Sequence, residues 1–236
     1  MDATENKVPK HIGIIMDGNR RFAKRLMLKP WKGHEFGAEK VEEVLEWCRE
    51  FKVRELTLYA LSIENFDRPK KEFDFLMDLF RKEFDRLKDD ARIMKEGIKI
   101  NFIGRIWMLA NDIQERMKFI MEKTKNNADF MLNFAVAYGG RAEIIDATKK
   151  IAEAVKNGNL KIEDINEEVF RKNIYLESEP DLIIRTGGEK RISGFLLWQG
   201  SYAELFWTDS LWPEFSKDDF QKALIDYSER ERRFGR

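Results

Sequence analysis

The sequence predicts an α/β fold in which helices cover a mainly parallel β-sheet. Short apolar runs and amphipathic segments of helical spacing alternate along the whole chain. No internal repeat, low-complexity tract or long linker interrupts this alternation, which is typical of parallel sheets covered on both faces. The length of 236 residues is one that a single domain commonly holds. We therefore expect residues 1–236 to form one domain.

The predicted strands are short, apolar and without helical period. The first, residues 12–16, is a continuous apolar run that contains three isoleucines, as expected for a strand buried on both faces. The others are β-rich or alternate apolar with polar residues, and they are residues 53–61, 98–103, 131–137 and 182–184.

The predicted helices place apolar side chains at steps of three and four residues. In residues 37–51 this spacing puts Val41, Val44 and Cys48 on one face. Pro69 opens a second helix that reaches Leu87, because proline is well tolerated in a first helical turn. Its stripe of phenylalanines is by default part of the core. The remaining helices are residues 106–123, 141–155, 165–173 and 216–232.

The composition excludes several classes of protein. Lysine plus arginine and aspartate plus glutamate balance at 43 each, which argues against a nucleic-acid partner. The single cysteine, Cys48, excludes an internal disulfide, and two histidines are too few for a zinc cluster. No apolar run of about 20 residues is present, and the polar amino terminus does not resemble a signal peptide. We expect a cytoplasmic protein that is free to contact a membrane peripherally.

The most informative motif follows the first predicted strand. It consists of Asp17, Gly18, Asn19, Arg20 and Arg21. Ligands of open α/β sheets bind at the carboxyl ends of the strands. A carboxylate among arginines can hold Mg²⁺ and phosphate oxygens together, because aspartate coordinates the hard cation while guanidinium groups chelate the anion. A solvated turn after an edge strand is the simpler alternative for this motif taken alone.

Two further strand ends carry polar and charged residues. The second strand runs into residues 62–69, and the fifth runs into residues 185–193. The latter combines Arg185 and Arg191 with two glycines, which suits a diphosphate cradle of guanidinium and backbone N–H groups. It is neither a Walker A loop nor a dinucleotide fingerprint. A glycine-containing turn with unrelated arginines is the alternative.

For two isolated residues, the sequence alone does not decide whether their role is functional or structural. His34 stands just before a predicted helix and would reach the Asp17 loop if both flank one cleft, although a lone histidine is more often a cap or a satisfied polar group. Glu204 is an acid in an aromatic and apolar setting. A buried acid needs a partner, and a metal ion is one candidate.

Taken together, these motifs resemble the cis-prenyltransferases, the family of undecaprenyl and dehydrodolichyl diphosphate synthases. The resemblance covers nearly the whole chain, and the Asp17 and Ser62 motifs look more like archaeal and eukaryotic members than bacterial ones. The matching stretches, in family order and spacing, are residues 11–21, 33–34, 62–66, 68–69, 138–141, 181–199, 202–205 and 231–235.

The resemblance implies a six-stranded parallel sheet, a homodimer and a catalytic domain that adds isopentenyl diphosphate repeatedly to an allylic diphosphate, such as farnesyl or geranylgeranyl diphosphate. It implies Mg²⁺ held by Asp17, with Glu204 as a second metal ligand, and Asn65 as a proposed proton acceptor, a weak role for a neutral amide. The substrate-binding residues that it implies are Gly18, Asn19, Arg20, Arg21, Phe22, His34, Ser62, Ile63, Glu64, Phe66, Arg68, Arg185, Arg191, Ile192 and Ser193.

The chain departs from the family pattern at Pro30, where many members carry arginine, at Lys190, where bacterial members often carry histidine, and at Phe22, which replaces tryptophan. None of these changes removes a central residue, so we expect activity. A non-catalytic partner subunit is the first alternative, and a nucleotide- or RNA-binding domain is the second.

Two further expectations follow from the resemblance. The stripe on residues 69–87 would form one wall of a product tunnel, with Ala60 and Phe130 near its far end. The tail residues Arg233, Phe234 and Gly235 would reach across the dimer to the isopentenyl diphosphate of the neighbouring subunit.

Overall fold

All six strands lie in one parallel sheet, described here from a computed structural model for residues 8–230. The spatial order is β3-β4-β2-β1-β5-β6. The sheet therefore confirms the predicted fold class. The strands are β1 (His11–Ile15), β2 (Glu55–Tyr59), β3 (Ile98–Ile103), β4 (Phe130–Ala135), β5 (Leu182–Arg185) and β6 (Glu204–Trp207).

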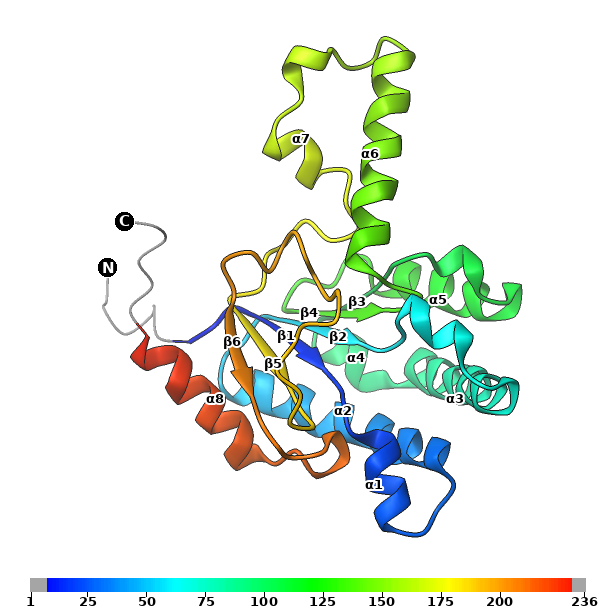
Figure 1. Ribbon diagram of the computed structural model, residues 1–236, viewed down its shortest axis with the longest axis vertical. Coiled ribbons are helices and arrows are strands. Elements are labelled where there is room, and N and C mark those ends of the chain that lie inside the picture. The colour runs from blue at the N-terminus through cyan, green and yellow to red at the C-terminus, as the bar shows by residue number, and fades with distance from the viewer. Residues whose placement is uncertain (1–7, 231–236) are drawn as a thin grey trace.

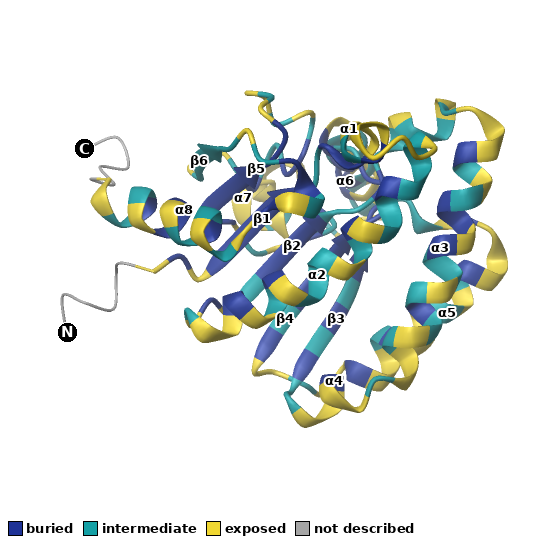
Figure 2. Cartoon of the chain, turned by 90° about the horizontal axis from the view of Figure 1, so that it is seen from below, coloured by how far each residue is buried: buried dark blue, intermediate teal, exposed yellow. Residues whose placement is uncertain are grey.

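Helices cover one face of this sheet (Figures 1 and 2). On that face α2, α3, α5 and α8 bury their apolar stripes in one large core, to which they contribute Val44, Leu76, Ile113 and Phe220. The α-helices among the described residues are α1 (Asn19–Arg25), α2 (Gly33–Glu50), α3 (Lys70–Asp89), α4 (Ala91–Lys95), α5 (Asn111–Thr124), α6 (Gly140–Lys156), α7 (Glu167–Arg171) and α8 (Lys217–Glu229).

A smaller core lies on the other face. There Tyr138, Phe195 and Leu196 are completely buried and pack with Ile183 of β5 and with Leu176. The chain between β5 and β6 supplies Phe195 and Leu196, so this cover is largely irregular structure rather than helix. The long helix α6 and the short helix α7 extend away from the sheet as an arm (Figure 1).

Three elements are absent from those predicted from the residue pattern, and several others have shifted bounds. Helix α1 begins inside the predicted Asp17 loop, because Gly18 adopts a left-handed φ of 109° that turns the chain directly into the helix. Strand β6 and helix α4 were not predicted from their residues. Both are short, and β6 begins with the charged Glu204, so neither shows an apolar period.

The position of β1 decides where a ligand can bind. It pairs with β2 on one side and with β5 on the other, so the chain leaves β1 toward one half of the sheet and later returns to the opposite half. In open α/β sheets the crevice for ligands lies at such a switch point, outside the carboxyl ends of the strands. Here the Asp17 loop and the loop after Arg185 flank that point.

Candidate active site

The Asp17 loop and the loop after β5 meet through a carboxylate held between two arginines. Arg185 Nη2 donates to Asp17 Oδ2 at 2.8 Å, and Arg21 Nη2 lies 3.2 Å from Asp17 Oδ1. The Arg185 side chain is buried, whereas Asp17 is partly exposed. An open carboxylate with guanidinium groups on either side is a site for a cation and an anion together.

Arg185 also shapes the loop that follows it. Its other terminal nitrogen donates to Ser193 Oγ at 2.7 Å and to the Arg191 carbonyl, which folds residues 186–193 back over the strand end. Gly187 at the closest point adopts a left-handed φ of 84° that side chains with a Cβ rarely adopt, and a Cβ there would displace the Arg21 guanidinium, whose Nη2 would lie 2.4 Å away. The predicted cradle residues of these two loops are therefore brought together.

A second charged cluster lies beside the first. The carboxylate of Glu72, on α3 and only 3% exposed, accepts from Arg68 Nη1 at 2.7 Å and lies 3.6 Å from Arg20 Nε. Arg68 Nη1 also donates to His34 Nε2 at 3.3 Å. This cluster joins α1, α2 and α3 at the cleft.

His34 is held neutral by its surroundings. Burial first, and then the charges of Arg68 and Arg20, lower the pKa of His34 from 6.5 to about 3. An arginine can only donate, so Nε2 of His34 must be the acceptor and its proton sits on Nδ1. A neutral His34 can therefore orient Arg68 without adding a further positive charge.

Replacement of His34 by glutamine is expected to flatten the pH dependence of the free energy of unfolding. The unfolded state binds a proton near pH 6.5 and the folded state only near pH 3. The unfolded state thus takes up more protons as the pH falls, so stability present above pH 6.5 is lost toward pH 3. Denaturant titrations of both proteins across this interval measure the difference. A stability difference that is constant with pH would contradict a neutral His34.

The Ser62 motif follows β2 as a short 3₁₀ turn, Ile63–Asp67. The backbone N–H of Ser62 donates to Asn65 Oδ1 at 3.2 Å, so the amide oxygen is already engaged and the amide nitrogen is left as a donor. This arrangement suits a hydrogen bond from Asn65 to a phosphate oxygen better than proton abstraction. Asn65 as proton acceptor stays a prediction.

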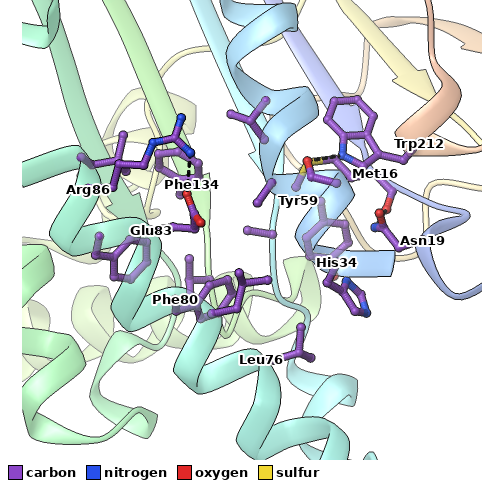
Figure 3. Close-up of a pocket in the computed structure, with 18 of the residues that line it drawn as sticks. Met16, Asn19, His34, Tyr59, Leu76, Phe80, Glu83, Arg86, Phe134 and Trp212 are labelled. Atoms are coloured by element: carbon purple, nitrogen blue, oxygen red, sulfur yellow. Dashed lines mark hydrogen bonds and ion pairs between the residues drawn. The ribbon is translucent and has the colours of Figure 1, made fainter. Parts of the chain in front are cut away.

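Two cavities join at this cleft. A polar cavity lies between the Asp17 loop, the Ser62 motif, residues 139–142 and the loop after β5. An apolar cavity runs from Asn19 and His34 down between α2, α3 and the sheet, where Leu76, Phe80 and Phe134 lie along it (Figure 3). Both are lined by Met16, Tyr59, Asn65 and Arg68. The combination suits a substrate with an anionic head and a hydrocarbon chain.

Helix α3 lines the apolar cavity, whereas the two residues predicted near the far end of a product tunnel do not lie at a far end of this cavity. Ala60 lines the apolar cavity one residue beyond the carboxyl end of β2, close to the charged clusters. Phe130 lies at the opposite end of the sheet, in the packed core, and is not among the residues that line the cavity. Phe134, four residues along β4, lines the cavity instead.

Glu204 is not near Asp17. It pairs in register with Leu182, at the amino end of β5, whereas Asp17 follows the carboxyl end of β1. Its Oε2 forms an ion pair with Nη1 of Arg230 at 2.6 Å. The two acids cannot share one ion within a single chain, so Glu204 as a ligand for the ion at Asp17 would require a second copy.

The three departures from the family pattern are not among the residues that line either cavity. The Phe22 ring packs edge-on against Phe36 at 5.3 Å, Pro30 begins a 3₁₀ turn, and Lys190 is exposed. Ile192 packs against the smaller core, and Arg191 pairs with Glu189. The tail residues Arg233, Phe234 and Gly235 lie outside the described residues.

Two groups at this site were not among the predicted site residues, although Arg141 lies in one of the motifs that match the family. In the sequence, Glu72 looks like an ordinary acidic residue in the first turn of a helix. Its spacing of four residues from Arg68 is the signal that could have indicated their ion pair. Arg141 and Arg105 line the polar cavity, but Arg105 is occupied by a bidentate ion pair with Asp146. Arg141 is exposed and is the further cation of this cavity.

The donors at the cleft fit Mg²⁺. This ion usually takes one or two carboxylates and completes its coordination with water and substrate phosphates. Among residues 8–230 no group of three histidine, cysteine, aspartate or glutamate side chains could hold a metal. Asp17, partly exposed and facing the polar cavity, is the carboxylate that such a shared site needs.

Comparison with known proteins decides the family. Residues 15–235 match the family model described as "Putative undecaprenyl diphosphate synthase". The chain belongs to the cis-prenyltransferases. It is therefore a transferase that condenses isopentenyl diphosphate with an allylic diphosphate, as a polyprenyl diphosphate synthase.

Two archaeal cis-prenyltransferases are similar over nearly their whole length. Both are named tritrans,polycis-undecaprenyl-diphosphate synthase (geranylgeranyl-diphosphate specific). The Methanopyrus kandleri protein is 49% identical over 98% of this chain and 86% of its own length. The Methanocaldococcus jannaschii protein is 50% identical over 98% of this chain and 84% of its own.

A solved cis-prenyltransferase-like structure shares the fold. Lavandulyl diphosphate synthase from Lavandula x intermedia, in complex with dimethylallyl diphosphate, superposes with a TM-score of 0.92 at 33% identity. The match covers 98% of this chain and 99% of that one. No helix among residues 8–230 is long and apolar enough to cross a bilayer.

Proposed function

We propose that this cis-prenyltransferase is a Mg²⁺-dependent enzyme that elongates geranylgeranyl diphosphate to a polyprenyl diphosphate of the undecaprenyl type, a precursor of glycosyl carrier lipids. The names of the archaeal relatives support this primer and this product class. The observation that carries the proposal is the junction of the two cavities at Asn65 and Arg68, where a charged head and a growing hydrocarbon chain would meet.

Incorporation of labelled isopentenyl diphosphate into a butanol-soluble product tests the proposal. We expect incorporation with Mg²⁺, its loss with EDTA, and a preference for geranylgeranyl over farnesyl diphosphate as primer. Failure with every allylic primer would favour the alternative, a non-catalytic partner subunit. The intact Asp17–Arg185 pair argues against that alternative, since a subunit without chemistry has no need of it.

In the proposed reaction, the allylic C–O bond ionises and the leaving diphosphate gains negative charge. Mg²⁺ held by Asp17 would neutralise part of that charge. Arg21 and the Gly18–Asn19 backbone would hold the allylic diphosphate, while Arg185 and Ser193 would hold the isopentenyl diphosphate. Such fixed donors stabilise a developing anion without reorganising.

The Ser62 motif and the Glu72 cluster would orient the two substrates. Asn65 and Arg68 line both cavities, so they can contact a diphosphate at the point where the hydrocarbon chain begins. Glu72 and His34 both accept from Nη1 of Arg68 and so fix its guanidinium. The proton lost from isopentenyl diphosphate can pass to a diphosphate oxygen, since Asn65 is a poor base.

We further propose that the chain acts as one catalytic domain in a homodimer, with the tail residues Arg233, Phe234 and Gly235 serving the neighbouring site. The separation of Glu204 from Asp17 supports a site completed by a second copy. A product with a long hydrocarbon chain also supports peripheral contact with a membrane.

Phe134→Ala is expected to lengthen the products, because it enlarges the apolar cavity along which the chain grows. Phe130→Ala is the matched control: the same residue type on β4, also buried, but outside the cavity lining. Each change should cost about 3–5 kcal/mol of stability, while only the first should alter product length. Chromatography of the dephosphorylated products gives the result, and identical distributions for both variants would exclude this tunnel wall.

A further inference from the structure

The segment between the diphosphate cradle and α2 is strongly basic, although the whole chain is neutral. From Gly18 to His34 there is no acidic residue. The arginines nearest Asp17 face the cleft, but the others lie further along α1 and in the turn that follows it. The cations of the segment are Arg20, Arg21, Lys24, Arg25, Lys29 and Lys32.

The turn after α1 exposes three consecutive apolar side chains. Leu26 is 49%, Met27 96% and Leu28 42% exposed. Met27 also adopts a left-handed φ of 58°, a conformation that costs energy for any residue with a Cβ. The left-handed φ itself belongs to an ordinary helix C-terminus, which Lys52 repeats at the end of α2. The exposure of three consecutive apolar side chains at this turn, however, is not explained by packing within the chain.

This apolar tip is preformed. The backbone N–H groups of Met27 and Leu28 donate to the carbonyls of Lys24 and Ala23 at 3.0 and 2.9 Å. Behind the tip, α1 and α2 approach so closely that a Cβ on Gly33 would lie 1.9 Å from the Asn19 carbonyl oxygen. The turn projects from the body of the protein beyond the end of α1 (Figure 1).

We propose that the apolar tip, Leu26, Met27 and Leu28, inserts into the surface of an anionic lipid bilayer, with the surrounding cations against the headgroups. Lys24 and Lys29 flank the tip and form no ion pair with any residue in the described range 8–230. Arg25 pairs with Glu214. Lys32 pairs with Glu35. Apolar side chains flanked by two lysines that are unpaired among residues 8–230 match the interfacial region of such a membrane. Protein interfaces, in contrast, are depleted in lysine at their centre.

The location of the tip indicates what the membrane contact would do for the enzyme. This step of the inference rests on the proposed function. Helix α1 has seven residues, so the tip lies roughly 10 Å from the cradle at the other end of the same helix. The opening on that side is lined by Asp17, Arg20, Arg21 and Lys24. A bilayer bound at the tip would bring this opening to the lipid surface, where a prenyl diphosphate with its chain in the lipid can enter or leave.

Co-sedimentation with vesicles tests the proposal. Wild-type protein is expected to bind vesicles of phosphatidylcholine with 30% phosphatidylglycerol, and to bind pure phosphatidylcholine weakly. Leu26→Ser combined with Met27→Ser should weaken binding to the anionic vesicles at least tenfold. Ile225→Ser on α8, 55% exposed, is the matched control and should bind as wild type. Met27→Gly should lose affinity while keeping or raising the melting temperature, because it relieves the positive φ.

Equal binding by the wild type and the double serine variant would overturn the proposal. A changed oligomeric state in light scattering, with vesicle binding unaltered, would show instead that the tip contacts protein. Prenyl transfer in detergent separates the two proposals: the double variant should keep wild-type activity there. A wild type that binds vesicles but makes no product would refute the proposed function and leave the membrane contact standing.

Discussion

Asp17→Ala is expected to lower kcat at least about a thousandfold, the scale on which loss of a central electrostatic group is felt. Asp17 is the carboxylate at the switch point of the sheet, and it lies between Arg21 and Arg185. Without it the site keeps its anion-binding arginines and loses its cation ligand. We therefore expect KM for both diphosphates to change much less than kcat. Steady-state kinetics at saturating Mg²⁺ measure the split.

Two variants control this experiment. Asp17→Asn retains an acceptor for the buried Arg185 and should fold like wild type, yet should be nearly as inactive, because an amide is a poor ligand for Mg²⁺. Glu189→Ala removes a half-exposed carboxylate that pairs with Arg191 in the neighbouring loop, and should leave kcat within about twofold of wild type because exposed pairs contribute little. A near-normal kcat for either Asp17 variant would show that Asp17 takes no part in the chemical step.

Sequence reasoning found the part of the site that depends on strand ends. Asp17 and Arg185 are 168 residues apart, but each directly follows a buried apolar run. Parallel strands end at the same edge of the sheet, so two such loops on neighbouring strands must meet. The same logic located the Ser62 motif after β2. These predictions needed only the strand positions and the parallel arrangement.

Residues whose role depends on helix packing could not be found in this way. The four-residue spacing of Arg68 and Glu72 is visible in the sequence, but the burial of Glu72 depends on how α1 and α3 meet at the cleft. Phe130 and Phe134 are both apolar residues of β4, so the sequence does not show which of them lines the cavity. That depends on the position of α2 and α3 over the sheet. The sequence indicated that Glu204 is a buried acid that needs a partner, with a metal ion as one candidate. In the structure the partner is Arg230, directly after the end of α8.

The two charged clusters have different roles in the cleft. One consists of Asp17 with Arg21 and Arg185, and the other consists of Glu72 with Arg20 and Arg68. Asp17 faces the cavity and can exchange an arginine for a cation, whereas Glu72 is closed off from solvent and can only hold its arginines in place. Glu72 is therefore a positioning residue, acting through Arg20 and Arg68. Its removal should leave the substrates bound but poorly aligned.

Glu72→Ala is expected to reduce kcat about a hundredfold, the effect of an active-site displacement of about 1 Å, while KM for the allylic diphosphate stays similar or falls. The two arginines lose their common carboxylate and keep their attraction for the diphosphate. Glu72 is buried but Arg20 and Arg68 are partly exposed, so its removal should cost about 1–2 kcal/mol, or about 2–8 °C in melting temperature for a chain of this size.

The same helix provides the matched control. Lys70 and Asp74 form an ion pair at the same four-residue spacing on α3, but their side chains are 87% and 57% exposed. Asp74→Ala should leave both kcat and melting temperature nearly unchanged, since an exposed pair is worth little. Glu72→Gln keeps an acceptor for Arg68 and should recover much of the lost kcat. A Glu72→Ala enzyme that melts lower but turns over normally would reduce Glu72 to a structural residue, because a positioning role requires kcat to fall with KM preserved.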